Sequence, residues 1–230
     1  FITFSRKRCS INYQYSLSNT YLKKVSLCSD LGIIFDSKLN FNAHIDNVVS
    51  KTSRLLGFII RMCSDFSNIR TLLLLFNAFI RSNLEYCTVI WSPYFRIHIN
   101  RLESIQRRFV KFICFKRGIV YVNYCDILTY LGLLQLEVRR KMFDFILLFK
   151  ILSSLIVCPD ILRLFKLHVP ERRGRHTHLL ALFSSRTCYR FYSPVGRISR
   201  LSLAYSDIDI VGVSLTSFKR NIRTTLSTSF

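Results

Sequence analysis

The chain has 230 residues, half of them hydrophobic, and its 34 Lys and Arg outnumber 13 Asp and Glu, so the net charge is +21. A chain of this length and hydrophobicity can bury a sizeable core, which excludes an intrinsically disordered protein. The charge indicates an acidic partner, either a nucleic-acid backbone or an anionic membrane surface, and a charge kept for solubility alone is the less favoured alternative.

The first 42 residues favour β-structure. Short segments rich in aromatic and β-branched residues are separated by polar turns such as Ser18-Asn19, and they lie at residues 2–4, 13–17, 21–27 and 32–35. This pattern predicts two β-hairpins. The first residues already look like the middle of a strand, and the chain starts at Phe1, so we expect a fragment of a longer reading frame.

Residues 43–118 change to helical periodicity, and three helices are predicted. The first has one apolar face, made of Ile45, Val48, Val49, Thr52, Leu56, Ile59, Ile60 and Cys63. The second follows Ser67-Asn68 as one helix that Ser92-Pro93 ends, and it should be central because it is apolar on more than one side. The third covers residues 97–115, with a core stripe of Leu102, Ile105, Phe109, Phe112 and Ile113.

Residues 119–230 are predicted to form a helical extension. Helices are expected at residues 124–130, 136–152, 198–204 and 214–226, with Pro159 marking a turn. Residues 168–194 lose periodicity and collect Pro and Arg, which predicts a basic loop. The fold class is therefore mainly α, with short N-terminal β-hairpins followed by a helical bundle and a helical extension.

The first and third helices carry cations on the faces opposite or beside their apolar stripes. These cations are Lys51, Arg54 and Arg61 on the first helix and Arg101, Arg107, Arg108 and Lys111 on the third. A helix that presents Arg every three or four residues can contact phosphates without selecting a base sequence. Few acids neutralise these faces, so we predict phosphate contacts there, and a solvated surface is the alternative.

Several blocks resemble, in order, non-LTR (LINE-type, jockey-like) retrotransposon reverse transcriptases. The N-terminal blocks are Ile2-Thr3-Phe4-Ser5-Arg6-Lys7 and Asp30-Leu31-Gly32 with Asp36, Leu39, Phe41, His44 and Ile45. The next are Arg81, Leu84-Glu85-Tyr86, Trp91-Ser92-Pro93, Ile105-Gln106 and Phe109. The last are Leu131-Gly132-Leu133, Leu136, Arg139-Arg140, Phe149-Lys150-Ile151-Leu152, Val169-Pro170, Ser193-Pro194, Arg197 and Phe218-Lys219.

The resemblance implies a division of the chain into three parts. Residues 1–42 would be the end of the palm with the primer-grip hairpin, residues 43–118 the helical thumb, and residues 119–230 a helical extension. The primer grip would be at Leu31 and Gly32, because a turn that presses backbone against a primer strand needs a residue without Cβ. An ordinary hairpin glycine is the alternative.

One departure from the family is large, since these polymerases hold two Mg²⁺ ions with adjacent aspartates and the chain contains no Asp-Asp pair. The nearest imitation, Asp207 and Asp209, is predicted to be a solvated helix boundary. We therefore expect no catalytic residue and no cofactor in this chain, with Mg²⁺ held upstream in the intact enzyme. The chain would grip the RNA–DNA primer-template beside the missing palm and fingers.

The densest basic segment contains Arg172, Arg173, Gly174, Arg175, His176 and His178. Arg173 and Arg175 are predicted to contact nucleic acid, with an incidental linker charge as the alternative. His176, His178 and Cys188 could be three zinc ligands, but no fourth ligand occurs at the usual spacing. A zinc site is therefore not predicted.

The eight cysteines are spread singly, which predicts reduced, mostly buried thiols in a nuclear or cytoplasmic protein. Phe76, Phe79, Phe109 and Phe112 are expected in the core, and Trp91 is expected to plug a helix end. Two other functions stay open. One is a non-catalytic basic helical RNA-binding protein or decayed element product, and the other, which we do not favour, is a protein bound to anionic lipid.

Overall fold

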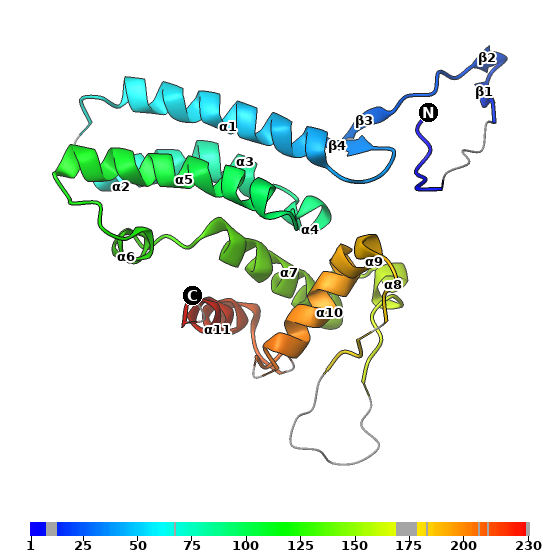
Figure 1. Cartoon of the computed structure of the whole chain (residues 1–230). Helices are drawn as coiled ribbons and strands as arrows, with labels where there is room; N and C mark the ends of the chain where they lie inside the picture. The colour runs from blue at the N-terminus through cyan, green and yellow to red at the C-terminus, as the bar shows by residue number, and fades with distance from the viewer. Residues whose placement is uncertain are drawn as a thin grey trace. The chain divides into compact units, whose positions relative to one another are not determined.

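The computed structural model of the chain describes residues 1–7, 13–66, 68–168, 179–182, 184–206, 208–210 and 212–228. The protein is mainly helical, with two small antiparallel sheets near the N-terminus (Figure 1). Contacts divide it into two compact units, which are considered one at a time. Unit 1 comprises residues 1–84 and 95–117, and unit 2 comprises residues 85–94 and 118–230.

The N-terminal part of unit 1 contains two β-hairpins, as predicted. The first pairs β1 (Ser16–Leu17) with β2 (Thr20–Tyr21), and the second pairs β3 (Leu27–Asp30) with β4 (Ile33–Asp36). Both hairpins turn through two residues with positive φ, the geometry that matches the right-handed twist of the strands. The prediction of a strand at residues 2–4 was wrong, and residues 21–27 divide between two hairpins instead of forming one strand.

The helical part of unit 1 is built around α1 (Asn42–Met62) and α5 (Arg96–Arg117). The buried residues of α1 include Ile45, Val48, Leu56 and Ile59, which confirms the predicted apolar face. The stripe of α5 is also buried, except that Phe112 is only partly covered. These two helices pack against each other because each has one continuous apolar face.

The predicted second helix is interrupted, and this is a correction. The segment comprises α2 (Ile69–Leu75), the π-helical turn η1 (Phe76–Arg81), α3 (Ser82–Glu85) and α4 (Thr88–Trp91). The side chains of Ser82 and Asn83 donate to the carbonyls four residues earlier, and such bonds compete with a regular α-helical ladder.

A left-handed residue then ends α3. Cys87 has φ 50°, and the indole Nε1 of Trp91 donates to the carbonyl of Tyr86 at 2.8 Å across this break. Trp91 is fully buried, which confirms its predicted role as a plug. Phe76 stacks on Phe109 in the core with ring centres 4.1 Å apart, but Phe79 is 53% exposed, so its predicted burial was wrong.

Unit 2 is helical beyond residue 118. Its helices are α6 (Tyr124–Tyr130), α7 (Leu136–Leu152), α8 (Pro159–Leu162), α9 (Cys188–Tyr192), α10 (Pro194–Ala204) and α11 (Leu215–Thr228). The predicted loop at 168–194 is not wholly irregular, because it contains α9 and a bridge between Leu167 and Leu180. Thr187 caps α9, and Ser193 caps α10 with Pro194 at its first position, so this helix starts earlier than predicted.

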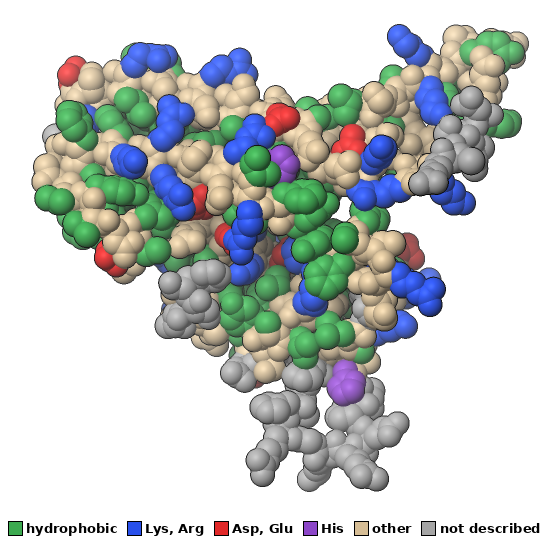
Figure 2. Space-filling view, viewed as in Figure 1, with side chains coloured by type: hydrophobic (Ala, Val, Ile, Leu, Met, Phe, Trp, Pro, Cys, Tyr) green, Lys and Arg blue, Asp and Glu red, His purple; other side chains and the backbone are tan. Residues whose placement is uncertain are grey.

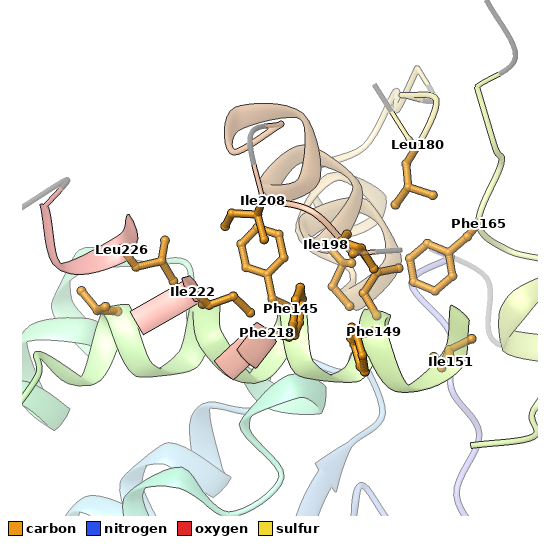
Figure 3. Close-up of a cluster of buried hydrophobic side chains, with 13 residues drawn as sticks. Phe145, Phe149, Ile151, Phe165, Leu180, Ile198, Ile208, Phe218, Ile222 and Leu226 are labelled. Atoms are coloured by element: carbon orange, nitrogen blue, oxygen red, sulfur yellow. The ribbon is translucent and has the colours of Figure 1, made fainter. Parts of the chain in front are cut away.

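The core of unit 2 forms where α7, α10 and α11 meet (Figure 3). Phe149 of α7 stacks on Phe218 of α11 with ring centres 4.4 Å apart. Ile198 of α10 and Ile222 of α11 complete the contact with α7. Residues 143–157 are mostly apolar, and their first part up to Leu152 belongs to the largely buried helix α7, whereas residues 153–157 lie beyond the helix and are exposed.

The cysteines correct one further prediction. Among the described residues only Cys63 and Cys114 are buried, whereas Cys87, Cys125 and Cys188 are exposed, and all of these are free thiols.

Candidate nucleic-acid interface

The outer face of α1 presents the three predicted cations to solvent. Lys51, Arg54 and Arg61 are exposed and lie opposite the buried stripe. Lys51 and Arg61 are about 15 Å apart along the helix at 1.5 Å per residue. Phosphates of one duplex strand follow each other at a rise of about 3.4 Å, so this face matches the length of about four of them.

The outer face of α5 presents a second cationic set. Arg107, Arg108 and Lys111 are exposed, one turn or less from each other. Arg101 differs from them, because its Nη1 donates to Oδ1 of Asp46 on α1 at 2.6 Å. Arg101 therefore acts as a link between the two helices in this structure.

The helices α1 and α5 run in parallel. Arg101 contacts Asp46 near the start of both helices, and Lys116 donates to the carbonyl of Cys63 at 2.7 Å near their ends. The two contact partners are 55 residues apart in sequence in the first contact and 53 in the second. Arg54 and Arg108 are separated by a similar number of residues, so they lie at about the same height along the two helix axes. Figure 2 shows Lys and Arg side chains over both helices on one face, with few acidic side chains among them.

Four of these cations have no ion pair or side-chain hydrogen bond within the described parts of the chain. They are Lys51, Arg54, Arg61 and Arg108. Lys and Arg side chains in this condition keep their charge and their donors available for an external anion. These four residues, together with Arg107 and Lys111, are called the α1–α5 face.

Exposed apolar side chains lie beside the cations, and they were not singled out from the sequence. Phe58 on α1 is 54% exposed and lies one turn from both Arg54 and Arg61, and Phe115 on α5 is 88% exposed. Phe58 is offset from the apolar stripe of α1, and this offset was the available signal. Exposed aromatic rings beside cations can stack on bases or sugars.

The predicted primer-grip residues form the tip of the second hairpin. Leu31 has φ 46° and Gly32 has φ 79°, so both central residues of the turn are left-handed. Leucine rarely adopts this left-handed conformation, and Gly or Asn is the usual residue at such a turn position. The Leu31 side chain is 81% exposed, so the turn presents an apolar tip on a tightly bent backbone.

Two polar residues fix this hairpin to α1. The carboxylate of Asp36 accepts the backbone N–H groups of Lys38, Asn40 and Phe41 at 2.8–2.9 Å, which holds the loop that leads into α1. Nδ1 of His44 accepts the N–H of Ile34 at 3.3 Å. Burial lowers the pKa of His44, in agreement with a neutral ring that accepts this bond.

Several residues that carry the family resemblance have a structural role inside unit 2. Arg139 of α7 forms a bidentate ion pair with Glu85. Arg197 of α10 pairs with both oxygens of Asp144 at 2.6 and 2.9 Å and donates to the carbonyl of Val89 at 2.7 Å. These bonds hold the segment 85–94 against the later helices of unit 2.

Two predicted contacts cannot be placed. Arg173 and Arg175 lie outside the described residues, as do Arg172, His176, His178 and Asp207. Among the residues that are described, no group of three or more His, Cys, Asp or Glu side chains could hold a metal ion. No helix in the described ranges is long and apolar enough to span a bilayer.

Comparisons with protein-family models, with curated proteins and with solved structures find no match. The resemblance to reverse transcriptases therefore stays a prediction from the sequence blocks.

Proposed function

We propose that this chain is a C-terminal part of a non-LTR retrotransposon reverse transcriptase and grips the RNA–DNA primer-template duplex. The observation that carries the proposal is the α1–α5 face, where two parallel helices expose cations at matching levels. Arg54 and Arg108 are both without a protein partner in the described structure, so a bound phosphate backbone would complete their charge pairing.

The face suits a duplex backbone better than a base sequence. Flexible Lys and Arg side chains on straight helices contact phosphates of any sequence, whereas reading bases requires groups that reach into a groove. A polymerase that copies any template needs such sequence-independent contacts. Phe58 and Phe115 would add contact with sugars or frayed bases at the same surface.

The Leu31–Gly32 turn would act as the primer grip. Gly32 has no Cβ, and its positive φ lets the backbone bend sharply, so the backbone of the turn can come close to a strand. Asp36 and His44 fix the turn relative to α1. The grip and the α1–α5 face would then hold one duplex together.

No catalytic step is assigned to this chain. Polymerases of the proposed family hold two Mg²⁺ ions with adjacent aspartates, and the sequence contains no Asp-Asp pair. In the proposed enzyme the metal-binding aspartates belong to the upstream palm.

Binding of a fluorescent RNA–DNA hybrid to the purified chain, measured by anisotropy at about 0.15 M salt, tests the proposal. Charge reversal at Arg54, Arg61 and Arg108 should weaken binding about tenfold or more, because three phosphate contacts become repulsive. Charge reversal at the exposed Lys219 of α11 is the control and should have little effect.

Two outcomes would contradict the proposal. Equal effects of the α1–α5 variants and of Lys219→Glu would show that the face is not the binding surface. Tight binding to anionic vesicles without binding to the hybrid would indicate a lipid partner. The family assignment has a separate test, since an open frame upstream of Phe1 should encode a Tyr-x-Asp-Asp box.

A further inference from the structure

A cavity of about 370 Å³ lies in unit 2. It is lined by residues of α9 and α10 and by Leu182, Ser184 and Ser185, which precede α9 in the chain. The geometry of these two helices depends on Gly196, because a Cβ there would lie 2.6 Å from the carbonyl oxygen of Arg190 and 2.9 Å from that of Phe191. The absence of a side chain lets α9 lie close to the first turn of α10. The volume is within the range of small-molecule sites, which is about 300–1,000 Å³.

The cavity wall holds a partly buried cation. The guanidinium of Arg200 lies 3.5 Å from the centre of the Phe191 ring, and its Nη1 donates to the carbonyl of Phe191 at 2.6 Å. Burial lowers the pKa of Arg200, the neighbouring Tyr192 opposes this shift, and the like charge of Arg197 adds to it. Arg200 forms no ion pair within the described residues, and a partly buried cation is stabilised by binding an anion.

The other walls combine hydroxyl groups with an apolar surface. The polar lining residues include Ser184, Ser185 and Arg190, and the apolar ones are Leu182 and Phe191. Arginine and serine together favour phosphate oxygens, since both donate hydrogen bonds. A phosphate alone would leave the apolar wall uncovered.

We propose that this cavity binds a single phosphorylated nucleotide unit, with the phosphate on Arg200 and Arg190 and the nucleoside against Leu182 and Phe191. A free nucleotide and a nucleotide within a single strand share this chemistry. The site is independent of the α1–α5 face, because all its residues belong to unit 2.

Calorimetric titration of the full chain with adenosine monophosphate tests the proposal. Adenosine monophosphate should bind at least about tenfold tighter than adenosine or inorganic phosphate, because only it offers both charge and apolar surface. Tighter binding of a 5′-phosphorylated trinucleotide would identify a strand as the source, and equal binding a free nucleotide. Equal affinities for adenosine monophosphate and adenosine, or no binding of either, would overturn the proposal.

Variants locate the site. Arg200→Gln should weaken binding of adenosine monophosphate about tenfold or more, whereas Arg186→Gln, at a nearby exposed arginine that does not line the cavity, should not. Because Arg200 also ties α9 to α10, Ser185→Asp is a second test, which adds a repelling carboxylate and leaves that tie in place. Equal losses in Arg200→Gln and Arg186→Gln would overturn the assignment.

The proposed hybrid-binding face and the proposed nucleotide cavity can be tested independently of each other. The triple charge reversal at Arg54, Arg61 and Arg108 should leave binding of adenosine monophosphate unchanged, and Arg200→Gln should leave binding of the hybrid unchanged. Loss of nucleotide binding in the triple variant would mean that the nucleotide occupies the α1–α5 face instead.

Discussion

Two helical glycines have different surroundings and should respond oppositely to alanine. At Gly196 a Cβ would lie 2.6 Å from a backbone oxygen that cannot move without shifting α9, so Gly196→Ala should destabilise unit 2 by about 1–3 kcal/mol. At Gly57 the nearest atom is the flexible end of Arg61 at 3.6 Å, so Gly57→Ala should stabilise α1 by about 0.5–1 kcal/mol. Chemical denaturation measures both, and a stabilising Gly196→Ala would contradict the close helix contact.

The buried His44 should make the stability of unit 1 depend on pH. Burial lowers its pKa from the usual 6.5, so the folded state prefers the neutral ring that accepts the N–H of Ile34. This stability is fully present above pH 6.5 and is lost as the pH falls through the lowered folded pKa. Denaturation midpoints should therefore be lower at pH 5.5 than at pH 7.5.

A matched variant separates His44 from other groups that titrate. In His44→Asn the amide oxygen can accept the same bond without becoming charged, so the difference between pH 7.5 and pH 5.5 should shrink. Carboxylates with ordinary pKa values, near 4, change little in this interval. Burial raises the pKa of Asp144, but this residue is present in both proteins and contributes equally to both. An unchanged difference in the variant would assign the pH dependence to another residue.

At the scale of the elements, the ion pair of Asp144 with Arg197 should be the most sensitive contact of unit 2. Burial raises the pKa of Asp144, and the hydrogen bonds and charge of Arg197 oppose that rise. Asp144→Ala leaves the guanidinium without its carboxylate in a mostly buried place, so it should cost about 3–5 kcal/mol. The double variant Asp144→Leu/Arg197→Met should be more stable than Asp144→Ala.

An exposed pair provides the control. Asp160 and Arg163 are 3.7 Å apart with side chains 89% and 80% exposed, so Asp160→Ala should change the free energy of unfolding by less than about 0.5 kcal/mol. Similar losses in Asp144→Ala and Asp160→Ala would show that the buried pair is no more important than a surface one.

Local patterns were sufficient to predict most elements of this chain. The apolar spacing of α1, α5, α6 and α7 predicted these helices, because each buries one continuous face in the period of an α-helix. The break at Cys87 was not predictable in the same way. It depends on the bond from the Trp91 indole to Tyr86 and on contacts of Glu85 and Val89 with residues more than fifty positions away.

The candidate site was predictable only in part for the same reason. The exposed positions of Lys51, Arg54 and Arg61 follow from the helical period of α1 alone. The pairing of Arg101 with Asp46 depends on how α1 lies beside α5, and a helical pattern does not contain that information. The cavity at Arg200 likewise depends on a close contact between two helices at Gly196.

At the scale of the whole molecule, a net charge of +21 gives affinity for any polyanion, so binding of nucleic acid alone does not identify a surface. Attraction by the net charge of the whole protein and binding through phosphate contacts at one surface differ in how the association constant depends on salt. Each phosphate contact contributes a slope of about −0.9 to the logarithm of the association constant against the logarithm of salt. The slope therefore counts contacts, whereas the net charge does not.

Two triple variants of equal charge make this difference measurable. Arg54→Gln/Arg61→Gln/Arg108→Gln and Lys166→Gln/Lys219→Gln/Arg220→Gln both lower the net charge from +21 to +18, since three cations become neutral. If the α1–α5 face holds the duplex, the first variant should reduce the magnitude of the salt slope by about 2.7, and the second should leave it near its original value. Equal slopes in the two variants, measured from 50 to 200 mM salt, would mean that the charge of the whole molecule governs binding, because removing a cation from a localised interface removes one phosphate contact and the nucleic-acid counterion that this contact releases.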